Sequence, residues 1–174
     1  SRTHAASLIP AGAVRVDGAE IRKASHRVTD DAVIDVAQTD HYVSRGAVKL
    51  AAALDAFAVD PSGRIALDLG ASTGGFTQVL RERGARTVVA VDVGHAQLDA
   101  GIRADPGVVV VEGFNAREMT SAHWRSRSAG EEGPEIVVGD LSFISLRHIP
   151  PAIARVVPAS ADVVLLVKPQ FEVG

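Results

Sequence analysis

The order of apolar and polar residues divides the chain into two segments with different rhythms. Over residues 13–23 the two kinds alternate around the pair Asp17-Gly18, which predicts a two-stranded hairpin. A helix over residues 1–12, ending at Gly12, and a further strand over 32–37 would complete a small module. The rhythm changes at Ser44, so we predict one domain over residues 1–41 and a second over 42–174.

The second segment alternates short apolar runs with helical pieces. Its first helix begins with Ser44 as the N-cap and extends to about residue 59. Strands are predicted at 64–69, 87–93, 108–112, 135–140 and 162–168, and helices at 75–83, 96–103, 116–125 and 144–156. The strands are nearly continuous Val, Ile and Leu, which is typical of parallel strands covered on both faces. The pattern predicts a doubly wound, Rossmann-like α/β domain with a mostly parallel sheet and a ligand at the carboxyl ends of its strands.

Composition narrows the class of protein. The 174 residues are 47% hydrophobic and include no cysteine, which excludes a disulfide scaffold and a cysteine-zinc site. The net charge of -3 argues against a uniformly basic nucleic-acid binder. The six histidines are scattered, and the longest apolar runs are strand-sized. We therefore expect a soluble cytoplasmic protein with no metal and no membrane segment. The absence of an initiating methionine and the end just after a strand lead us to expect a piece of a longer protein.

The stretch DLGASTGGF follows the first strand of the second segment and holds three glycines. Asp68 lies at the strand end, and Gly70, Gly74 and Gly75 allow the backbone to turn tightly and approach a ligand. The spacing is G-x-x-x-G-G, and it differs from the G-x-G-x-x-G of dinucleotide-binding turns. The alternative is that these glycines make only a tight strand-to-helix turn.

The ends of the next two strands carry polar residues that suit an adenosine. Asp92 follows Asp68 by 24 residues, where an acid accepts hydrogen bonds from ribose hydroxyls. Asn115 follows the third strand, where an adenine edge is read. These features do not separate NAD from S-adenosylmethionine, and each residue has a helix N-cap as its alternative role.

Three further charged residues lie where a doubly wound sheet opens. Lys49 is on the helix before the first strand, while Asp140 and Lys168 end the fourth and fifth strands. Two lysines that share one aspartate can keep one lysine neutral enough to act as a base toward a weak hydroxyl nucleophile. The alternatives are a solvated face for Lys49 and a turn cap for Asp140.

These blocks together resemble a known family. SRGAVKL, DLGASTGGFTQVL, AVDVG, VVGDLSFISL and LLVKPQFEVG are similar to the TlyA (hemolysin A) family of ribosomal RNA 2'-O-methyltransferases, within the FtsJ-like group. The resemblance is collinear over residues 42–174. Residues 1–25 resemble the second half of an S4-type RNA-binding domain, which makes the first segment a partial S4-type module.

The resemblance implies a methyltransferase that uses S-adenosylmethionine and acts on cytidine ribose in the RNA of the small or large ribosomal subunit. It implies a catalytic Lys-Asp-Lys-Glu tetrad in which Lys49, Asp140 and Lys168 fill the first three places and Lys168 is the base. The glutamate would come from beyond Gly174, as would the last two strands of the sheet, because Glu172 is too close to Lys168 in sequence. Cofactor binding is assigned to Asp68, Gly70, Ser72, Gly74, Gly75, Phe76, Asp92 and Asn115. Substrate RNA contacts are assigned to Arg2, Arg15, Arg22, Lys23 and Arg45, for which a solvated surface is the alternative.

Two other functions remain open at this point. One is an NAD-type Rossmann oxidoreductase, against which the glycine spacing and the lysines argue. The other is an RNA-binding or hemolysin-like protein that keeps the fold without catalysis. No strongly amphipathic basic helix supports a cytolytic role.

Overall fold

The computed structural model describes residues 8–10, 12–36, 41–128 and 133–173. Within it the chain forms two compact units, Ser1–His41 and Tyr42–Gly174. Most of the helix predicted over residues 1–12 lies outside the described residues. Each unit is described by itself.

The first unit contains a three-stranded antiparallel sheet in the order β2-β1-β3, formed by β1 (Val14–Val16), β2 (Ala19–Ile21) and β3 (Ile34–Val36). The predicted hairpin is present, and both of its turn residues, Asp17 and Gly18, have positive φ angles of 50° and 80°. The Asp17 carboxylate also accepts a hydrogen bond from the Val33 backbone at 2.9 Å, which ties the hairpin to the segment before β3.

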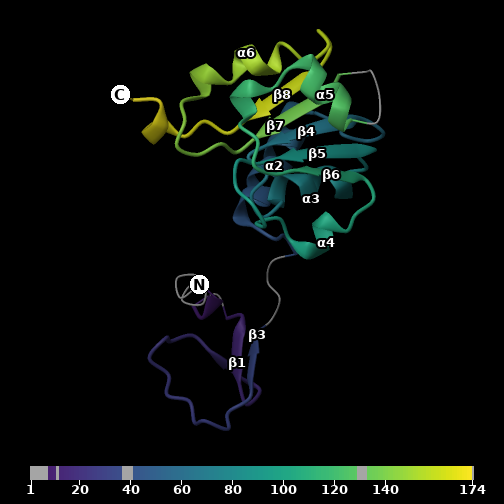
Figure 1. The fold of residues 1–174 in the computed structure, drawn as a ribbon. Coiled ribbons are helices and arrows are strands. Elements are labelled where there is room, and N and C mark those ends of the chain that lie inside the picture. The colour runs from purple at the N-terminus through teal and green to yellow at the C-terminus, as the bar shows by residue number, and fades with distance from the viewer. Residues whose placement is uncertain (1–7, 11, 37–40, 129–132, 174) are drawn as a thin grey trace. The chain divides into compact units, whose positions relative to one another are not determined.

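The second unit is built on a five-stranded parallel sheet in the order β6-β5-β4-β7-β8, as Figure 1 shows. Its strands are β4 (Ile65–Leu69), β5 (Thr87–Val91), β6 (Val108–Val111), β7 (Ile136–Gly139) and β8 (Asp162–Leu165). All four neighbouring pairs are parallel. This arrangement confirms the predicted Rossmann-like α/β fold. The order reverses between β4 and β7, which is where such sheets bind ligands.

Side chains of the central strand alternate between two cores, as the pleat of a strand requires. The odd residues of β4, such as Leu67, pack with Met119, which follows η1 (Ala116–Glu118), and with Trp124 of α5 (Ser121–Arg127) and Ile153 of α6 (Pro150–Ile153). Ala66, on the other face, packs against α2 (Arg45–Phe57) and α3 (Gly75–Glu82). The sheet is therefore covered on both faces, which explains its unbroken apolar strands.

Several predicted helices are shorter than expected. The helix predicted over 96–103 is reduced to α4 (Ala100–Arg103), because Asp99 caps it and accepts hydrogen bonds from the backbone of its first turn. The helix predicted over 116–125 is divided into η1 and α5 by Thr120, the N-cap of α5. The helix predicted over 144–156 becomes η2 (Leu146–His148) and α6, because Pro150 and Pro151 lack the N–H groups that a continuous helix needs.

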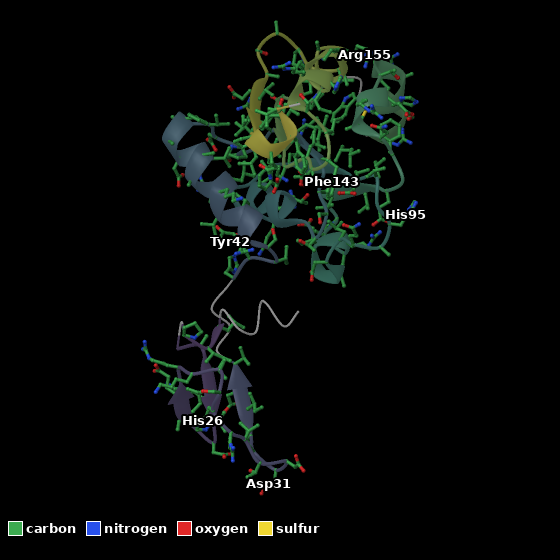
Figure 2. The ribbon with its side chains drawn as sticks, turned by 90° about the vertical axis from the view of Figure 1, so that its left-hand side faces the viewer. His26, Asp31, Tyr42, His95, Phe143 and Arg155 are labelled. Carbon is green, nitrogen blue, oxygen red and sulfur yellow. The ribbon has the colours of Figure 1, made fainter. Side chains whose placement is uncertain are left out.

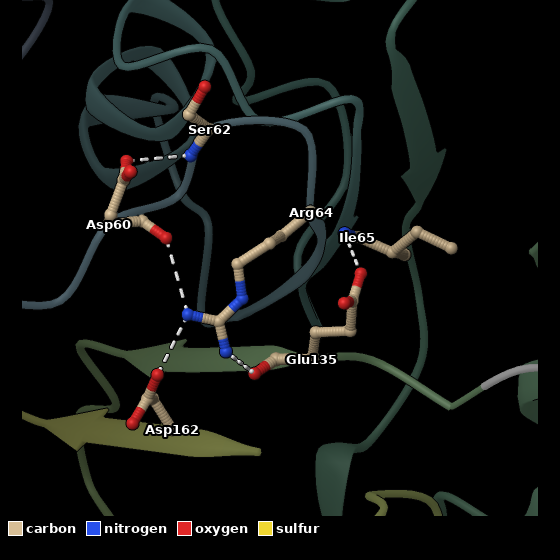
Figure 3. A network of polar contacts seen from close by, with 6 residues as sticks. All are labelled: Asp60, Ser62, Arg64, Ile65, Glu135 and Asp162. Carbon is tan, nitrogen blue, oxygen red and sulfur yellow. Dashed lines mark hydrogen bonds and ion pairs between the residues drawn. The ribbon is translucent and has the colours of Figure 1, made fainter. Parts of the chain in front are cut away.

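A polar network joins the amino ends of β4, β7 and β8 (Figure 3). The Arg64 guanidinium donates to the Asp162 carboxylate at 2.8 Å and to the Glu135 backbone carbonyl at 2.5 Å. The Glu135 carboxylate accepts from the Ile65 backbone at 2.9 Å, and the Asp60 carbonyl accepts from Arg64 at 3.2 Å. One arginine thus connects the starts of β4, β7 and β8, at the edge of the sheet opposite the predicted ligand site.

Candidate functional site

Two neighbouring cavities open at the carboxyl ends of the strands. The first, about 580 Å³, is lined by residues that follow β4, β5, β6 and β7. The second, about 530 Å³, lies between the start of α2, the glycine loop and the ends of β7 and β8. Four residues line both cavities, namely Gly70, Ser72, Asp140 and Ser142. The two spaces therefore share a wall or an opening at these residues.

Asp92, at the end of β5, fixes the glycine loop. Its two carboxylate oxygens accept hydrogen bonds from the backbone N–H groups of Ser72 and Gly94, each at 2.7 Å. Ser72 has a φ of 48°, a left-handed conformation that costs a non-glycine residue energy, and the bond to Asp92 helps to hold it. Asp92 also lines the first cavity, where the remaining lone pairs of its carboxylate can accept ribose hydroxyls.

Three other N–H groups of the loop are also bonded within the protein. Those of Gly70 and Ala71 donate to the Val91 carbonyl at 2.8 and 3.1 Å, and that of Gly74 donates to the Ala71 carbonyl at 2.7 Å. Pyrophosphate binding at a strand-to-helix turn depends on free N–H groups that point at the anion. Four N–H groups of the loop, counting that of Ser72, are therefore not available to a pyrophosphate.

Asp68 lies beneath the loop and is fully buried. Its Oδ2 accepts a hydrogen bond from the Thr77 hydroxyl at 2.7 Å, while Oδ1 has no hydrogen-bond partner in the described part of the chain. Burial raises the pKa of Asp68 to about 7, the bond from Thr77 opposes the rise, and the nearby carboxylates of Asp140 and Asp92 add to it. Asp68 lines neither cavity, so it can act on a ligand there only through its charge.

The next three residues assigned to cofactor binding are placed by close packing. A Cβ atom on Gly75 would come within 2.0 Å of the Ser44 hydroxyl, and one on Gly74 would come within 2.7 Å of Ile102. Phe76 is buried in the core beside α2 and lines the second cavity. Gly75 and Phe76 therefore connect the loop to the start of α2. Ser44 is the N-cap residue of α2 as predicted, but its hydroxyl makes no capping hydrogen bond.

Lys168 lies three residues after β8, which ends earlier than the predicted 168, and it meets Asp140, the residue after β7. The Lys168 ammonium lies 2.6 Å from Oδ1 of Asp140 and donates a hydrogen bond to the Ser142 hydroxyl at 2.6 Å. About a fifth of the Lys168 side chain and a quarter of the Asp140 side chain are exposed, so the pair faces the cavity. A lysine held by a carboxylate beside a hollow can exchange a proton with a bound hydroxyl.

Lys49 and Arg45 lie one turn apart on α2 and line the second cavity with Lys168. Both are exposed. Lys49 makes no ion pair with a described residue, so Asp140 is paired with one lysine and not with the two that the sequence pattern predicts. The second cavity nevertheless has three cations around its single carboxylate, an arrangement that suits a polyanionic ligand.

The far wall of the first cavity is formed by residues after β5 and β6. The Asn115 side-chain oxygen accepts from the Arg117 backbone at 3.1 Å, so Asn115 caps η1, the alternative role considered for it. Asn115 also lines the first cavity, and its side-chain amide carries two N–H donors. Val93 is 72% exposed and Phe114 lines the same space, which gives the cavity an apolar section. Arg127 lies over the Phe114 ring at 4.7 Å.

Sequence reasoning gave no role to three residues of the site. Ser142 and Phe143 lie in the loop after β7, and Glu172 lies in the segment after β8. Ser142 contacts Lys168, as described. Phe143, labelled in Figure 2, is 92% exposed, has a φ of 63° and lies 5.4 Å from the Phe171 ring. Glu172 accepts hydrogen bonds from the Ser145 hydroxyl at 2.6 Å and the Leu146 backbone at 2.7 Å. The blocks GDLSFISL and VKPQFE contain these residues, but no spacing rule pairs positions so far apart.

The basic residues assigned to the first unit are mostly exposed. Arg22 pairs with Glu20 at 2.5 Å, and Arg15 lies opposite Glu20 and Asp35 on the neighbouring strands. Lys23 lines an apolar hollow of about 230 Å³. Arg2 lies outside the described residues. The S4-type identity of this unit stays a prediction.

Two kinds of feature are absent from the described part of the chain. No helix among them is long and apolar enough to cross a membrane. They also contain no group of three or more His, Cys, Asp or Glu side chains arranged to hold a metal ion.

Comparisons with known proteins agree on one family. The family model described as FtsJ-like methyltransferase matches residues 42–174. The 16S/23S rRNA (cytidine-2'-O)-methyltransferase TlyA of Mycobacterium tuberculosis is 50% identical over 100% of this chain and 63% of its own length. Hemolysin A of Brachyspira hyodysenteriae is 41% identical over 99% of this chain and 70% of its own. Among solved structures, a "putative hemolysin from Streptococcus thermophilus" has a TM-score of 0.77 at 38% identity and covers 100% of this chain and 62% of that one.

Proposed function

Because the chain belongs to the FtsJ-like methyltransferase family, we propose that it transfers a methyl group from S-adenosylmethionine to the ribose 2'-hydroxyl of a cytidine in ribosomal RNA. The chain spans 63% of the length of its M. tuberculosis relative, whose name gives that reaction and both ribosomal RNAs as substrates. A relative from Campylobacter jejuni is named for the 23S RNA alone. We assign the activity to the cytoplasm, where ribosomal RNA is found.

The first cavity fits S-adenosylmethionine by its chemistry. Asp92 offers acceptors for the ribose hydroxyls, and Val93 and Phe114 offer apolar surface for the adenine. The carboxylates of Asp92 and Asp140 line the cavity and supply negative charge for a ligand that carries an ammonium and a sulfonium, and the buried Asp68 adds to it when ionised. When bound, the cofactor supplies an electrophilic methyl group. An NAD-type enzyme is less well supported, because four of the loop N–H groups that could bind pyrophosphate are already bonded.

The observation that carries the proposal is the Lys168–Asp140 pair at the boundary of the two cavities. In this reading the second cavity takes the ribose and its phosphate, with Arg45 and Lys49 contacting the phosphate. Lys168 accepts the proton of the 2'-hydroxyl, and Asp140 holds the lysine in place. The exposed Phe143 ring beside the first cavity offers a stacking surface to an unpaired base.

The deciding experiment measures binding and transfer separately with the full-length protein. Calorimetric titration should detect S-adenosylmethionine and no NAD. Mass spectrometry of ribosomal RNA digests should find a 2'-O-methylated cytidine, and Lys168→Ala should reduce the transfer rate by about 100-fold or more while cofactor affinity changes little. Arg86→Ala is the matched control, because it removes an exposed cation that precedes β5, at the opposite edge of the sheet.

The outcomes separate the candidate functions. Binding of NAD in place of S-adenosylmethionine would support the oxidoreductase. Binding of RNA with no methyl transfer at any tested site would support the protein without catalysis. Full transfer by Lys168→Ala would contradict the role of the lysine.

A further inference from the structure

Ser142 lies where the two cavities meet and contacts the proposed base directly. Its hydroxyl accepts a hydrogen bond from the Lys168 ammonium at 2.6 Å, on the same nitrogen that lies 2.6 Å from Asp140. It lines both cavities and is itself exposed. The serine is therefore part of the environment of Lys168 without being part of the core.

The two contacts that the Lys168 nitrogen makes, with Ser142 and Asp140, limit the direction in which it can make a third. The Nζ atom has three tetrahedral positions besides its bond to Cε, and each carries either a proton or, in the neutral amine, a lone pair. Ser142 occupies one of them by a hydrogen bond, and Asp140 lies 2.6 Å from the same nitrogen as an ion-pair partner whose contact lacks hydrogen-bond geometry. The bond to Ser142 fixes rotation about the Cε–Nζ bond, so the position left free has one direction. With the Asp140 ion pair alone, that rotation would leave the direction undefined.

We propose that Ser142 is a positioning residue that fixes the direction of the free Nζ position of Lys168, an inference that rests on the proposed methyl transfer. In that reaction the ribose oxygen forms a bond to the methyl carbon, and the carbon–sulfur bond breaks with its electron pair left on sulfur. The hydroxyl proton moves to the Nζ lone pair. Transfer depends on alignment of donor and acceptor, so a lone pair with one direction accepts this proton more efficiently than a rotating one.

The loop that carries Ser142 is held at both ends. The Asp140 backbone donates to the Leu69 carbonyl at 3.1 Å, which continues the pairing of β7 with β4. Three residues beyond Ser142, the Ser145 hydroxyl donates to the Glu172 carboxylate at 2.6 Å. These two hydrogen bonds hold the backbone on either side of Ser142, and a positioning role requires a residue that is held in this way.

Three variants of the full-length protein test the proposal. Ser142→Ala removes the acceptor, Ser142→Thr keeps it with a methyl group that the exposed site can accommodate, and Ser62→Ala is the control in the turn before β4. We expect Ser142→Ala to lower kcat by about 10-fold to 100-fold while KM for RNA and calorimetric affinity for S-adenosylmethionine change by less than about 2-fold. Ser142→Thr should recover most of kcat, and Ser62→Ala should match the parent.

A second readout needs neither RNA nor cofactor. The ¹⁵N NMR signal of a lysine ammonium is sharp only when bonds slow the exchange of its hydrogens with water. The Lys168 signal, identified by its loss in Lys168→Arg, should exchange several-fold faster in Ser142→Ala and return to the parent rate in Ser142→Thr.

The two readouts separate the proposal from the function on which it rests. An inactive parent would overturn the proposed function, and the NMR signal would still report on Ser142. Unchanged exchange in Ser142→Ala would overturn the positioning role, as would full kcat in that variant when Lys168→Ala is inactive. Equal losses in kcat and in cofactor affinity would also overturn it, because they indicate a distorted site.

Discussion

Replacement of Asp68 by asparagine should make the second unit more stable at neutral and alkaline pH. Asp68 is fully buried and its pKa is raised from 3.8 to about 7. At about 1.4 kcal/mol for each unit of pKa, this interval corresponds to about 4 kcal/mol. Asparagine has nearly the same shape, keeps an oxygen for the Thr77 hydroxyl and does not ionise. The variant therefore avoids the cost of a buried charge.

The pH dependence of this stability gain follows from proton binding. The folded-state pKa lies above the unfolded-state value, so between pH 3.8 and about 7 the folded protein binds more protons than the unfolded chain. The stability that the protonated acid contributes is fully present below pH 3.8 and is lost as the pH rises through 7. The gain from Asp68→Asn should thus be small near pH 4 and about 4 kcal/mol at pH 8.

The assay is urea unfolding of parent and variant at several pH values from 5 to 8. The single tryptophan, Trp124, is buried in the second unit, so its fluorescence reports on the unit that contains Asp68. Asp99→Asn is the control, because asparagine caps α4 as well as the exposed aspartate does. A difference between Asp68→Asn and parent that stays constant from pH 5 to pH 8 would refute the reasoning.

The same variant should bind S-adenosylmethionine more weakly above pH 7. There the parent offers an ionised carboxylate to a cationic ligand, and the variant offers a neutral amide. Calorimetry of both proteins at pH 8 checks this expectation. An unchanged affinity would mean that the charge of the Asp68 carboxylate does not contribute to ligand binding.

Three further predictions concern packing and charge. Gly75→Ala should destabilise the second unit by about 1–3 kcal/mol, since its Cβ would meet the Ser44 hydroxyl. Adding Ser44→Ala should relieve part of that loss in the double variant. Free energies of urea unfolding that are purely additive would contradict the contact. Glu172→Gln should be less stable than the parent at pH 7, and the difference in stability should shrink as the pH falls. The reason is that hydrogen bonds from Ser145 and the backbone hold the pKa of Glu172 below its ordinary 4.5. A difference in stability that persists below pH 3 would exclude this cause. Arg64→Ala should lower the free energy of urea unfolding by about 1–2 kcal/mol. It should leave cofactor affinity unchanged, since the partners of Arg64 lie at the amino ends of the strands. A loss of cofactor affinity would show coupling between the two ends of the strands.

The positions of the strands were predictable because a single physical cause sets them. A parallel strand buried on both faces must be apolar throughout, and the runs around Leu67, Val89 and Val137 have that composition. The ends of the helices depend on single residues. Thr120 and Asp99 act as caps only where the backbone has the right conformation, and a sequence does not display that conformation.

The site was predictable to the extent that strand ends determine it. Asp140 and Lys168 were expected together, because their strands are parallel neighbours and end at the same edge. The contact between Ser142 and Lys168 depends on the path of an irregular loop, and the contact between Glu172 and Ser145 joins two such loops. No periodicity describes a loop, so sequence reasoning had no signal for these pairs.

The two halves of the proposed site meet at the point where the order of the sheet reverses. β4 has β5 on one side and β7 on the other, so the loop that follows β4 lies beside both the Asp92 strand and the Asp140 strand. Gly70 is the first residue of that loop. A Cβ atom there would come within 3.1 Å of the Asp140 carbonyl oxygen, and its φ of 81° is one that glycine adopts without strain. A larger residue would move the loop after β4 away from the strand end that carries Asp140. The structure therefore requires Gly70 for the close approach of the two loops that follow β4 and β7.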